Sequence, residues 1–203
     1  MSEVKTEKLS PRVTSLQFGD SGDTFTVPSG ATLDIASGAA LTNSGTATGF
    51  GKVLQVVSFE KTDTASSSSE SFASTGVEVS ITPSSTSSKV LVMAQVGISS
   101  DGNYVAVGCI LQRDSTILNQ ADAASNRSRY STGYNYQYSG YDIVNMPITY
   151  LDSPSSTSSL TYKVMYKTNS ASYPVYLNRS YFDNDTSYYG RSSSTITAME
   201  IAG

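Results

Sequence analysis

The chain has 203 residues, of which 15% are charged, and its formal net charge is −4 at pH 7. This length suits one ordinary domain with a short appendage, and the charge offers no basic surface to attract nucleic acid. The single cysteine, Cys109, and the lack of histidine exclude intrachain disulfides, cysteine-based zinc sites and histidine-centred catalysis. No apolar run is long enough for membrane insertion. The polar residues are mostly Ser, Thr, Gly, Asn and Tyr, which favours an all-β fold.

Residues 1–15 are predicted to form an extended tail, because charges alternate there, Ser10 precedes Pro11 and few side chains are apolar. The segment either docks into a larger assembly as an attachment peptide or is a frayed terminus without a function. It lacks the apolar core of a secretion signal, so the chain is expected to be made and kept in a cytoplasm.

Residues 16–51 contain an eight-residue repeat and end in a Gly-rich hinge. The first two units are Thr24 to Gly30 and Thr32 to Gly38, and a degenerate third begins at Ala40. Each unit reads as a short strand with a tight turn and offers too few apolar side chains to offset its backbone entropy. Such units must stack on copies of themselves or on other chains, and a segment this short has few neighbours of its own, which favours partner chains and predicts a homotrimeric β-repeat stem. Its core residues would be Phe25, Val27, Leu33, Ile35 and Leu41.

From residue 52 the sequence changes to longer strands joined by Ser-rich loops. Strands are expected over 52–60, 72–82, 89–98, 104–113, 116–120, 141–151, 160–166, 175–177 and 194–201. About nine strands without a helical segment predict an antiparallel β-sandwich head over 52–203, and eight core strands would make it jelly-roll-like. The strand order stays open.

Individual strands carry more specific predictions. The near-continuous apolar run 52–60 is compatible with burial on both faces. Segments 89–98 and 104–113 are expected to pair as a hairpin through the turn residues 101–103. Pro147 indicates an edge strand or a bulge. Cys109 alternates with Val107 and Leu111, which predicts a buried small hydrophobe rather than a nucleophile.

Tyrosine is unusually frequent, with 14 Tyr and no Trp, and it gathers in two polar loops. Alternate positions 134, 136 and 138 would place three rings on one face, about 7 Å apart, which resembles the spacing of successive sugar rings. Tyr and Arg in long loops suit recognition of a glycan or a protein, but packing or a subunit interface explains Tyr equally well. The candidate ligand-binding residues are Tyr130, Tyr134, Tyr136, Tyr138, Tyr181, Tyr188, Tyr189, Arg129 and Arg191.

No pattern predicts catalysis, a cofactor or a metal site. Asp142, Asp152, Asp183 and Asp185 could serve as paired carboxylates, but nothing in the sequence groups them. The abundant serines lack both a histidine base and a Gly-x-Ser-x-Gly turn. Residues 183–186 lack the glycine and the distal glutamate of a calcium-binding loop. The chain is therefore predicted not to be an enzyme.

The segment from Gly22 to Gly38 resembles the N-terminal stem repeats of bacteriophage tail-fibre and related virion proteins, particularly from phages of marine bacteria and cyanobacteria. The closing segment from Thr195 to Gly203 resembles the last strand of such proteins. The resemblance implies a homotrimer whose N-terminus attaches to the virion and whose C-terminal β-domain meets the host surface. The head differs from enzymatic tailspikes with long parallel β-helices, which leaves binding rather than glycan cleavage.

The resulting prediction is a non-enzymatic tail-fibre protein of a virion assembled in the host cytoplasm. Its expected partners are two further copies of the chain, other virion proteins at the N-terminus, and a host-surface glycan or protein. One alternative is a structural virion protein that decorates the capsid or helps to assemble the tail. A cellular carbohydrate-binding module or adhesin is a third possibility, although such a protein should carry a secretion signal.

Overall fold

The computed structural model describes residues 52–101, 105–134 and 140–203, together with Thr24, 26–32, Asp34 and Ser37. The chain divides into two compact units, Met1–Thr48 and Gly49–Gly203. The predicted tail 1–15, the hinge glycines and four of the five predicted stem core residues lie outside the described residues. These four are Phe25, Leu33, Ile35 and Leu41.

In the N-terminal unit, the structure describes the turn that closes the first repeat. The amide of Ala31 donates to the carbonyl oxygen of Pro28 at 3.0 Å, and Gly30 between them has φ of 85°. A positive φ at the third position of such a turn favours glycine, which explains its place in the repeat. Val27, the one described residue of the predicted stem core, is 38% exposed within a single chain.

The second unit contains eleven strands in the described part of the chain. They are β1 Val53–Lys61, β2 Ala65–Ser67, β3 Ala73–Ile81, β4 Lys89–Ser100, β5 Val107–Arg113, β6 Thr116–Ile117, β7 Thr132–Tyr134, β8 Val144–Asp152, β9 Leu160–Thr168, β10 Val175–Leu177 and β11 Ser194–Ile201. All pairings between these strands are antiparallel, so the predicted all-β class is confirmed. Nowhere in the described part does a helix have the length and apolar character needed to cross a membrane.

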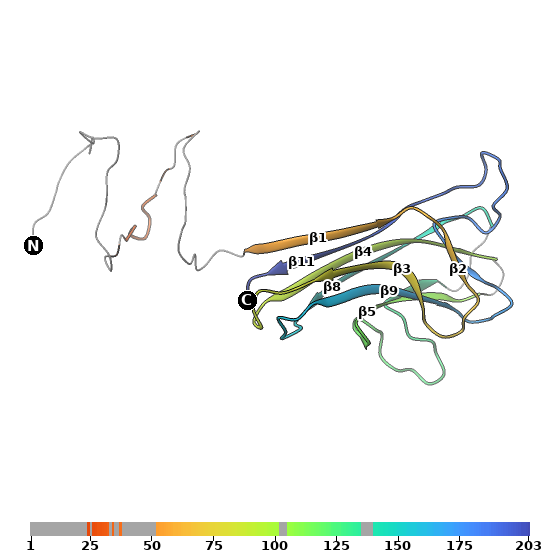
Figure 1. Cartoon of the computed structure of the whole chain (residues 1–203), viewed down its shortest axis with the longest axis horizontal. Coiled ribbons are helices and arrows are strands. Elements are labelled where there is room, and N and C mark those ends of the chain that lie inside the picture. Colours follow the sequence, from red (N-terminus) through yellow and green to blue (C-terminus); the bar gives the residue numbers. More distant parts are fainter. Residues whose placement is uncertain are drawn as a thin grey trace, which may run out of the picture. The chain divides into compact units, whose positions relative to one another are not determined.

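The strands form two sheets that face each other as a sandwich (Figure 1). Sheet A has the order β1–β11–β4–β8, and the short strands β2 and β10 extend it beside the end of β4. Sheet B has the order β3–β9–β5, with β6 and β7 both pairing with β5. The chain crosses repeatedly from one sheet to the other, and the resulting strand order is that of a jelly roll. The predicted antiparallel β-sandwich is thus confirmed.

The hydrophobic core lies between the sheets and follows the period-two alternation of the strands. In β4 the buried hydrophobic residues are every second one, Val90, Val92, Ala94, Val96 and Ile98, and the last residues of the strand are buried on both faces. They pack in one cluster with the inward side chains of β5 and β9. Alternation of apolar and polar positions is what a sheet with one core-facing side requires.

The predicted hairpin of residues 89–98 and 104–113 is wrong. β4 pairs with β11, β10 and β8 in sheet A, whereas β5 pairs with β9, β7 and β6 in sheet B. Both strands alternate because each presents one face to the same core from opposite sheets. Alternation reveals which face of a strand is buried but does not identify its neighbour.

The prediction that the first long strand is buried on both faces is also wrong for the single chain. β1 pairs only with β11 among the described strands, which makes it an edge of sheet A. Val53, Leu54, Val56 and Phe59 remain exposed there.

Two other local predictions are confirmed. Pro147 lies in β8, whose described pairing is with β4 alone, so the proline occupies an edge strand as expected. Cys109 is fully buried in the core, and this burial raises the pKa of its thiol to about 12. A thiol with so high a pKa is inert at neutral pH.

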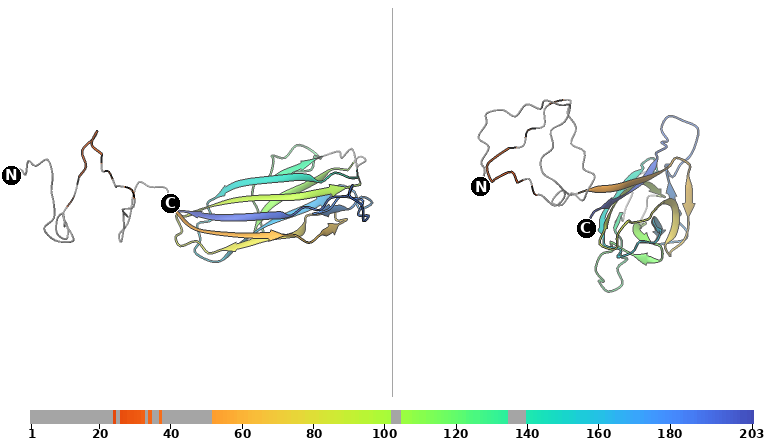
Figure 2. Two further views of the ribbon diagram at one scale, coloured as in Figure 1. Left: turned by 90° about the horizontal axis from the view of Figure 1, so that it is seen from above. Right: turned by 60° about the vertical axis from the view of Figure 1, so that its left-hand side comes forward.

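The sandwich has two distinct ends (Figure 2). At the proximal end β1 and β4 begin and β11 finishes, and the amide of Ala202 donates to the carbonyl oxygen of Lys52 at 2.9 Å. The distal end holds the last residues of β4, the short strand β10 and the loops around them. The preceding chain therefore joins the sandwich at the end opposite to these loops.

Candidate functional site

Loop 178–193 at the distal end is fixed to the strands by one buried residue, Asn178. Its amide nitrogen Nδ2 donates to the carbonyl oxygens of Lys61 and Asp63 at 2.8 and 3.0 Å. Its Oδ1 accepts from the hydroxyl of Ser194 at 2.5 Å. Its φ of 60° lies in the left-handed region, which asparagine tolerates better than most residues. The loop therefore begins from a rigid point on sheet A.

Aromatic rings gather on this loop. Tyr181 and Phe182 lie 4.8 Å apart between ring centroids, and Tyr189 lies 6.0 Å from Phe182. Tyr141, from the segment before β8, stacks on Tyr189 with centroids 5.4 Å apart and ring planes inclined by 9°. Phe182 is 43% exposed, and Tyr188, the next ring along, is 79% exposed. We refer to Tyr141, Tyr181, Phe182, Tyr188 and Tyr189 as the distal aromatic cluster.

Close backbone approach holds the cluster together. The amide of Phe182 donates to the carbonyl oxygen of Gly140 at 3.2 Å. A Cβ atom at Gly140 would lie 2.5 Å from the Phe182 ring and 3.0 Å from the Tyr181 ring, so only glycine fits at this position. The cluster is thereby assembled from two segments that are 40 residues apart in the sequence.

Charged side chains frame the rings. Asp183 accepts from Arg191 at 2.7 Å and from Arg179 at 3.3 Å, and the Arg179 guanidinium lies 4.0 Å from the centroid of the Tyr176 ring. The negative charge of Asp101 raises the pKa of Tyr181. A shallow hollow of about 240 Å³ lies beside these groups, lined by Asp183, Asn184, Asp185, Thr186, Tyr189 and Arg191. The surface combines apolar ring faces with hydrogen-bonding groups at their rims.

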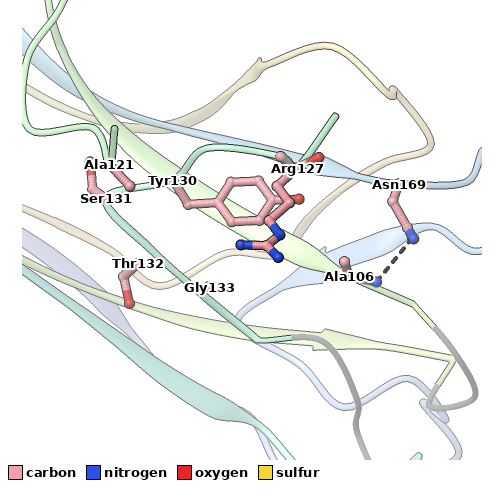
Figure 3. Close-up of a pocket in the computed structure, with 9 residues that line it drawn as sticks. Ala106, Ala121, Arg127, Tyr130, Ser131, Thr132, Gly133 and Asn169 are labelled. Carbon is pink, nitrogen blue, oxygen red and sulfur yellow. Dashed lines mark hydrogen bonds between the residues drawn. The ribbon is translucent and has the colours of Figure 1, made fainter. Parts of the chain in front are cut away.

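A second site lies where loop 118–131 crosses the outer face of sheet B. The loop is closed at its neck by the amide of Ala121, which donates to the carbonyl oxygen of Tyr130 at 3.1 Å. Between the loop and the strands is a pocket of about 490 Å³, which is within the range that small-ligand sites occupy. It is lined by Ala106, Ala121, Arg127, Ser128, Tyr130, Ser131, Thr132, Gly133 and Asn169 (Figure 3).

Two glycines position the Tyr130 ring in this pocket. Gly108 of β5 and Gly133 of β7 are directly paired across the strands. A Cβ atom would lie 1.9 Å from the ring at Gly108 and 2.8 Å from it at Gly133, so the ring rests on bare backbone. Phe72 meets the ring edge-on with centroids 6.4 Å apart, and the Lys167 ammonium lies 5.9 Å from its centroid. Among the described residues, the buried hydroxyl of Tyr130 has no hydrogen-bond partner.

The remaining candidate residues occupy different surroundings. Tyr134 packs against the core, its hydroxyl contacts that of Ser100 at 3.1 Å, and burial raises its pKa. The exposed Arg129 is held by its own loop, because its Nε donates to the carbonyl oxygen of Ala121 at 2.6 Å. Tyr136 and Tyr138 lie outside the described residues, so the predicted row of three rings stays a prediction.

Several contributors were not singled out in the sequence. Phe72 and Lys167 come from separate strand regions, and no pattern links them to Tyr130. The sequence does contain one signal for the Gly108–Gly133 pair, because a glycine within an apolar strand marks a close approach of another group. The group that approaches Gly108 cannot be identified without the strand register.

Of the candidate carboxylates, Asp183 and Asp185 line the same distal hollow, whereas Asp152 lies apart from them. Asp152 ends β8 at the proximal end, where it accepts from Arg113 at 2.5 Å and from the hydroxyl of Tyr162 at 2.6 Å. Asp183 lies in the distal loop and pairs with arginines. The described residues hold no group of three or more Cys, Asp or Glu side chains placed to bind a metal ion.

Comparison with known proteins finds no matching protein-family model and no matching curated protein. Among solved structures, the chain is similar to the infectious bursal disease virus VP2 subviral particle, with a TM-score of 0.39 and 10% sequence identity. The similarity covers 72% of this chain and 40% of that one, so the present chain spans less than half the length of the VP2 chain.

Proposed function

We propose that the chain is a non-enzymatic bacteriophage fibre protein that attaches to the virion by its N-terminus and recognises a host-surface glycan or protein. The observation that carries this proposal is the exposed distal aromatic cluster, at the end of the sandwich opposite to the entry of the chain. A tether at the N-terminus reaches the sandwich at its proximal end, which leaves the distal loops free to meet another surface.

The chemistry of the cluster suits recognition. Tyrosine and phenylalanine supply large apolar faces at low entropic cost, and tyrosine hydroxyls and arginine guanidinium groups supply hydrogen bonds around them. Ring faces stack on the apolar faces of sugars and equally on protein side chains. The anchor at Asn178 and the Tyr141–Tyr189 stack hold the rings in place, which reduces the entropy lost on binding.

A homotrimer forms part of this proposal, and an apolar row on the outer face of sheet A supports it. Val56, Met199, Leu91 and Leu151 are direct cross-strand neighbours, so the row crosses β1, β11, β4 and β8. Val56 is 54% exposed and Leu151 is 49% exposed. The outer face of an antiparallel sheet is normally polar, and a continuous apolar row across it is typical of a contact surface.

We infer that this outer apolar row contacts other copies of the same chain. The row lies toward the proximal end, close to Val53, where the repeat-containing segment joins the sandwich. Repeats that need partner chains for their core would hold the adjoining ends of the sandwiches near one another. Three heads on one particle would then convert weak single-site contacts into avidity.

We also propose that the chain has no catalytic activity. The pairs Arg113–Asp152 and Arg191–Asp183 are at opposite ends of the sandwich, and each carboxylate is already engaged by arginine. Two carboxylates that flank one glycosidic bond must lie within about 5–10 Å of each other. Asp152 and Asp183 cannot form such a pair.

Labelling of particles that carry this protein tests the proposal. Antibody fragments raised against residues 178–193 should bind the free ends of fibres and block adsorption to host cells. Labelling spread over the capsid surface, without any effect on adsorption, would instead establish the decorating role.

Substitutions give a second test on particles. Phe182→Ala and Tyr188→Ala together should lower adsorption by roughly tenfold, because exposed aromatic anchors dominate binding surfaces. Ile117→Ala, which alters an exposed apolar residue at the proximal end, is the matched control and should leave adsorption unchanged. Equal adsorption by all variants would remove the distal aromatic cluster from the receptor site.

A further inference from the structure

We propose that the pocket under loop 118–131 binds the carboxylate-bearing ring of an acidic sugar, such as a uronic acid of a host-surface polysaccharide. This inference deepens the proposed function and rests on it, since it names a ligand class for a second surface of the same protein. Three features of the pocket carry the inference: its size, its charge and the arrangement of its polar groups.

The pocket has the size and the walls that one sugar ring needs. Its volume of about 490 Å³ exceeds that of a single monosaccharide and leaves room for part of a neighbouring unit. Tyr130 and Gly133 provide an apolar side, and the hydroxyls of Ser128 and Thr132 line it as well. Figure 3 shows Asn169 on the far side of the opening, where its Oδ1 accepts from the amide of Ala106 at 2.9 Å. The Asn169 Nδ2 group thus remains available as a donor.

The charge at the pocket is positive, although the whole chain is acidic. Arg127 lines the pocket, is exposed, and forms no side-chain hydrogen bond or ion pair with any described residue. The Lys167 ammonium lies near the rings of Phe72 and Tyr130 and pairs with no carboxylate in the described part of the chain. No Asp or Glu is among the described residues that line the pocket.

An unpaired guanidinium beside hydroxyl and amide groups matches the chemistry of a uronic acid. The planar guanidinium donates two parallel hydrogen bonds to a carboxylate, and the ring hydroxyls of the sugar exchange hydrogen bonds with serine, threonine and asparagine. The Tyr130 ring, fixed on the Gly108–Gly133 pair, is a rigid surface for the apolar face of the sugar. A neutral sugar would leave the guanidinium without its partner.

Binding of defined oligosaccharides to the full chain tests this inference. The probes are tetrasaccharides of galacturonic acid and of glucuronic acid, each compared with its methyl ester, which differs only in lacking the charge. Calorimetry should show binding of at least one acid that is about tenfold or more tighter than binding of its ester. Binding of the acid should also weaken as the salt concentration rises, because the decisive contact is between charges.

Matched variants locate the site. Arg127→Gln should weaken acid binding by about tenfold or more, since it removes the charged hydrogen bonds. Lys163→Gln removes one positive charge that lies outside the pocket, on the same face of β9 as Lys167, and should leave binding of the acid unchanged. Thermal unfolding of both variants should match that of the unaltered protein, because the Arg127 side chain forms no hydrogen bond or ion pair with any described residue.

Three results would overturn the inference: no binding of either acid, equal binding of acid and ester, or an equal loss of acid binding in Arg127→Gln and Lys163→Gln. Adsorption separates this inference from the proposed function. If the purified protein does not bind the acid through Arg127 while the distal aromatic variants lose adsorption, the receptor role stands and the acidic-sugar site fails. If the purified protein binds the acid through Arg127 but particles adsorb without the protein, the site stands and the receptor role fails.

Discussion

Glu200 is a charged residue that the fold buries completely in β11. Its Oε1 accepts hydrogen bonds from the amide and hydroxyl of Ser84 and from the hydroxyl of Ser88, each at 2.7 Å. Its Oε2 accepts from Gln55 at 2.6 Å. Burial acts to raise the pKa of this carboxyl, but the hydrogen bonds outweigh it and lower the pKa to about 2. The carboxylate thus ties the loop before β4 to the closing strand.

Glu200→Gln is expected to lower the free energy of unfolding by about 1–3 kcal/mol, because an amide cannot accept at both former oxygen positions. The wild-type carboxyl has a folded pKa below its usual value of 4.5, so its contribution is full above that pH. The contribution declines as the pH falls toward 2, because the unfolded chain takes up the proton first. Urea unfolding of wild type and Glu200→Gln at pH 7 and pH 3 measures this contribution to the free energy of unfolding. A difference between wild type and variant that does not shrink at pH 3 would contradict the assignment.

Gly108→Ala tests the support beneath Tyr130. The added Cβ would lie 1.9 Å from the ring, so the ring must leave its place, at a cost of about 1–3 kcal/mol in unfolding free energy. Gly190→Ala is the matched control, because its Cβ would meet only the side chain of Ile143 at an ordinary 3.6 Å. Thermal denaturation should give a lower unfolding midpoint for Gly108→Ala than for Gly190→Ala. Equal midpoints would show that the Tyr130 ring does not rest on Gly108.

At the scale of strands, the sequence predicted the core better than the pairing. Alternation in 89–98 identified the buried face of β4 correctly, since each inward residue excludes water regardless of which strand lies beside it. Pairing depends on crossovers between sheets, which leave no periodic signal. The short strands β2 and β7 were likewise missed, because polar residues such as Ser66 and Thr132 join the ladder through their backbones alone.

The candidate site was predictable only in part for a similar reason. Tyr181 and Tyr189 share one loop, so composition alone drew attention to them. The stack of Tyr141 on Tyr189 and the close approach of Gly140 to Phe182 join segments that are distant in sequence. Such contacts depend on where both loops leave the sheets. The apolar character of β1 is compatible with burial on both faces, whereas Val56 lies exposed in the outer apolar row.

Leu151→Lys tests the row as a contact between copies. Leu151 is half exposed in β8, so a lysine there should change the unfolding free energy of a single chain by less than about 0.5 kcal/mol. In an assembly the buried charge would oppose association strongly. Asn145→Lys is the control on the same strand and face, toward the distal end. Analytical ultracentrifugation should show dissociation for Leu151→Lys alone, and unchanged association of both variants would assign the row to another role.

At the scale of the whole molecule, the predicted stem repeats and the outer apolar row support the same proposal, that the chain assembles with copies of itself. One chain has a mass of 21.5 kDa, so the proposed assembly has a mass of about 64.5 kDa. Because folding is then linked to association, the midpoint of thermal unfolding should rise with protein concentration. Light scattering gives the mass, and unfolding at two concentrations a hundredfold apart gives the linkage. A 21.5 kDa particle whose midpoint is the same at both concentrations would contradict the trimer, and the row would have to face a different protein.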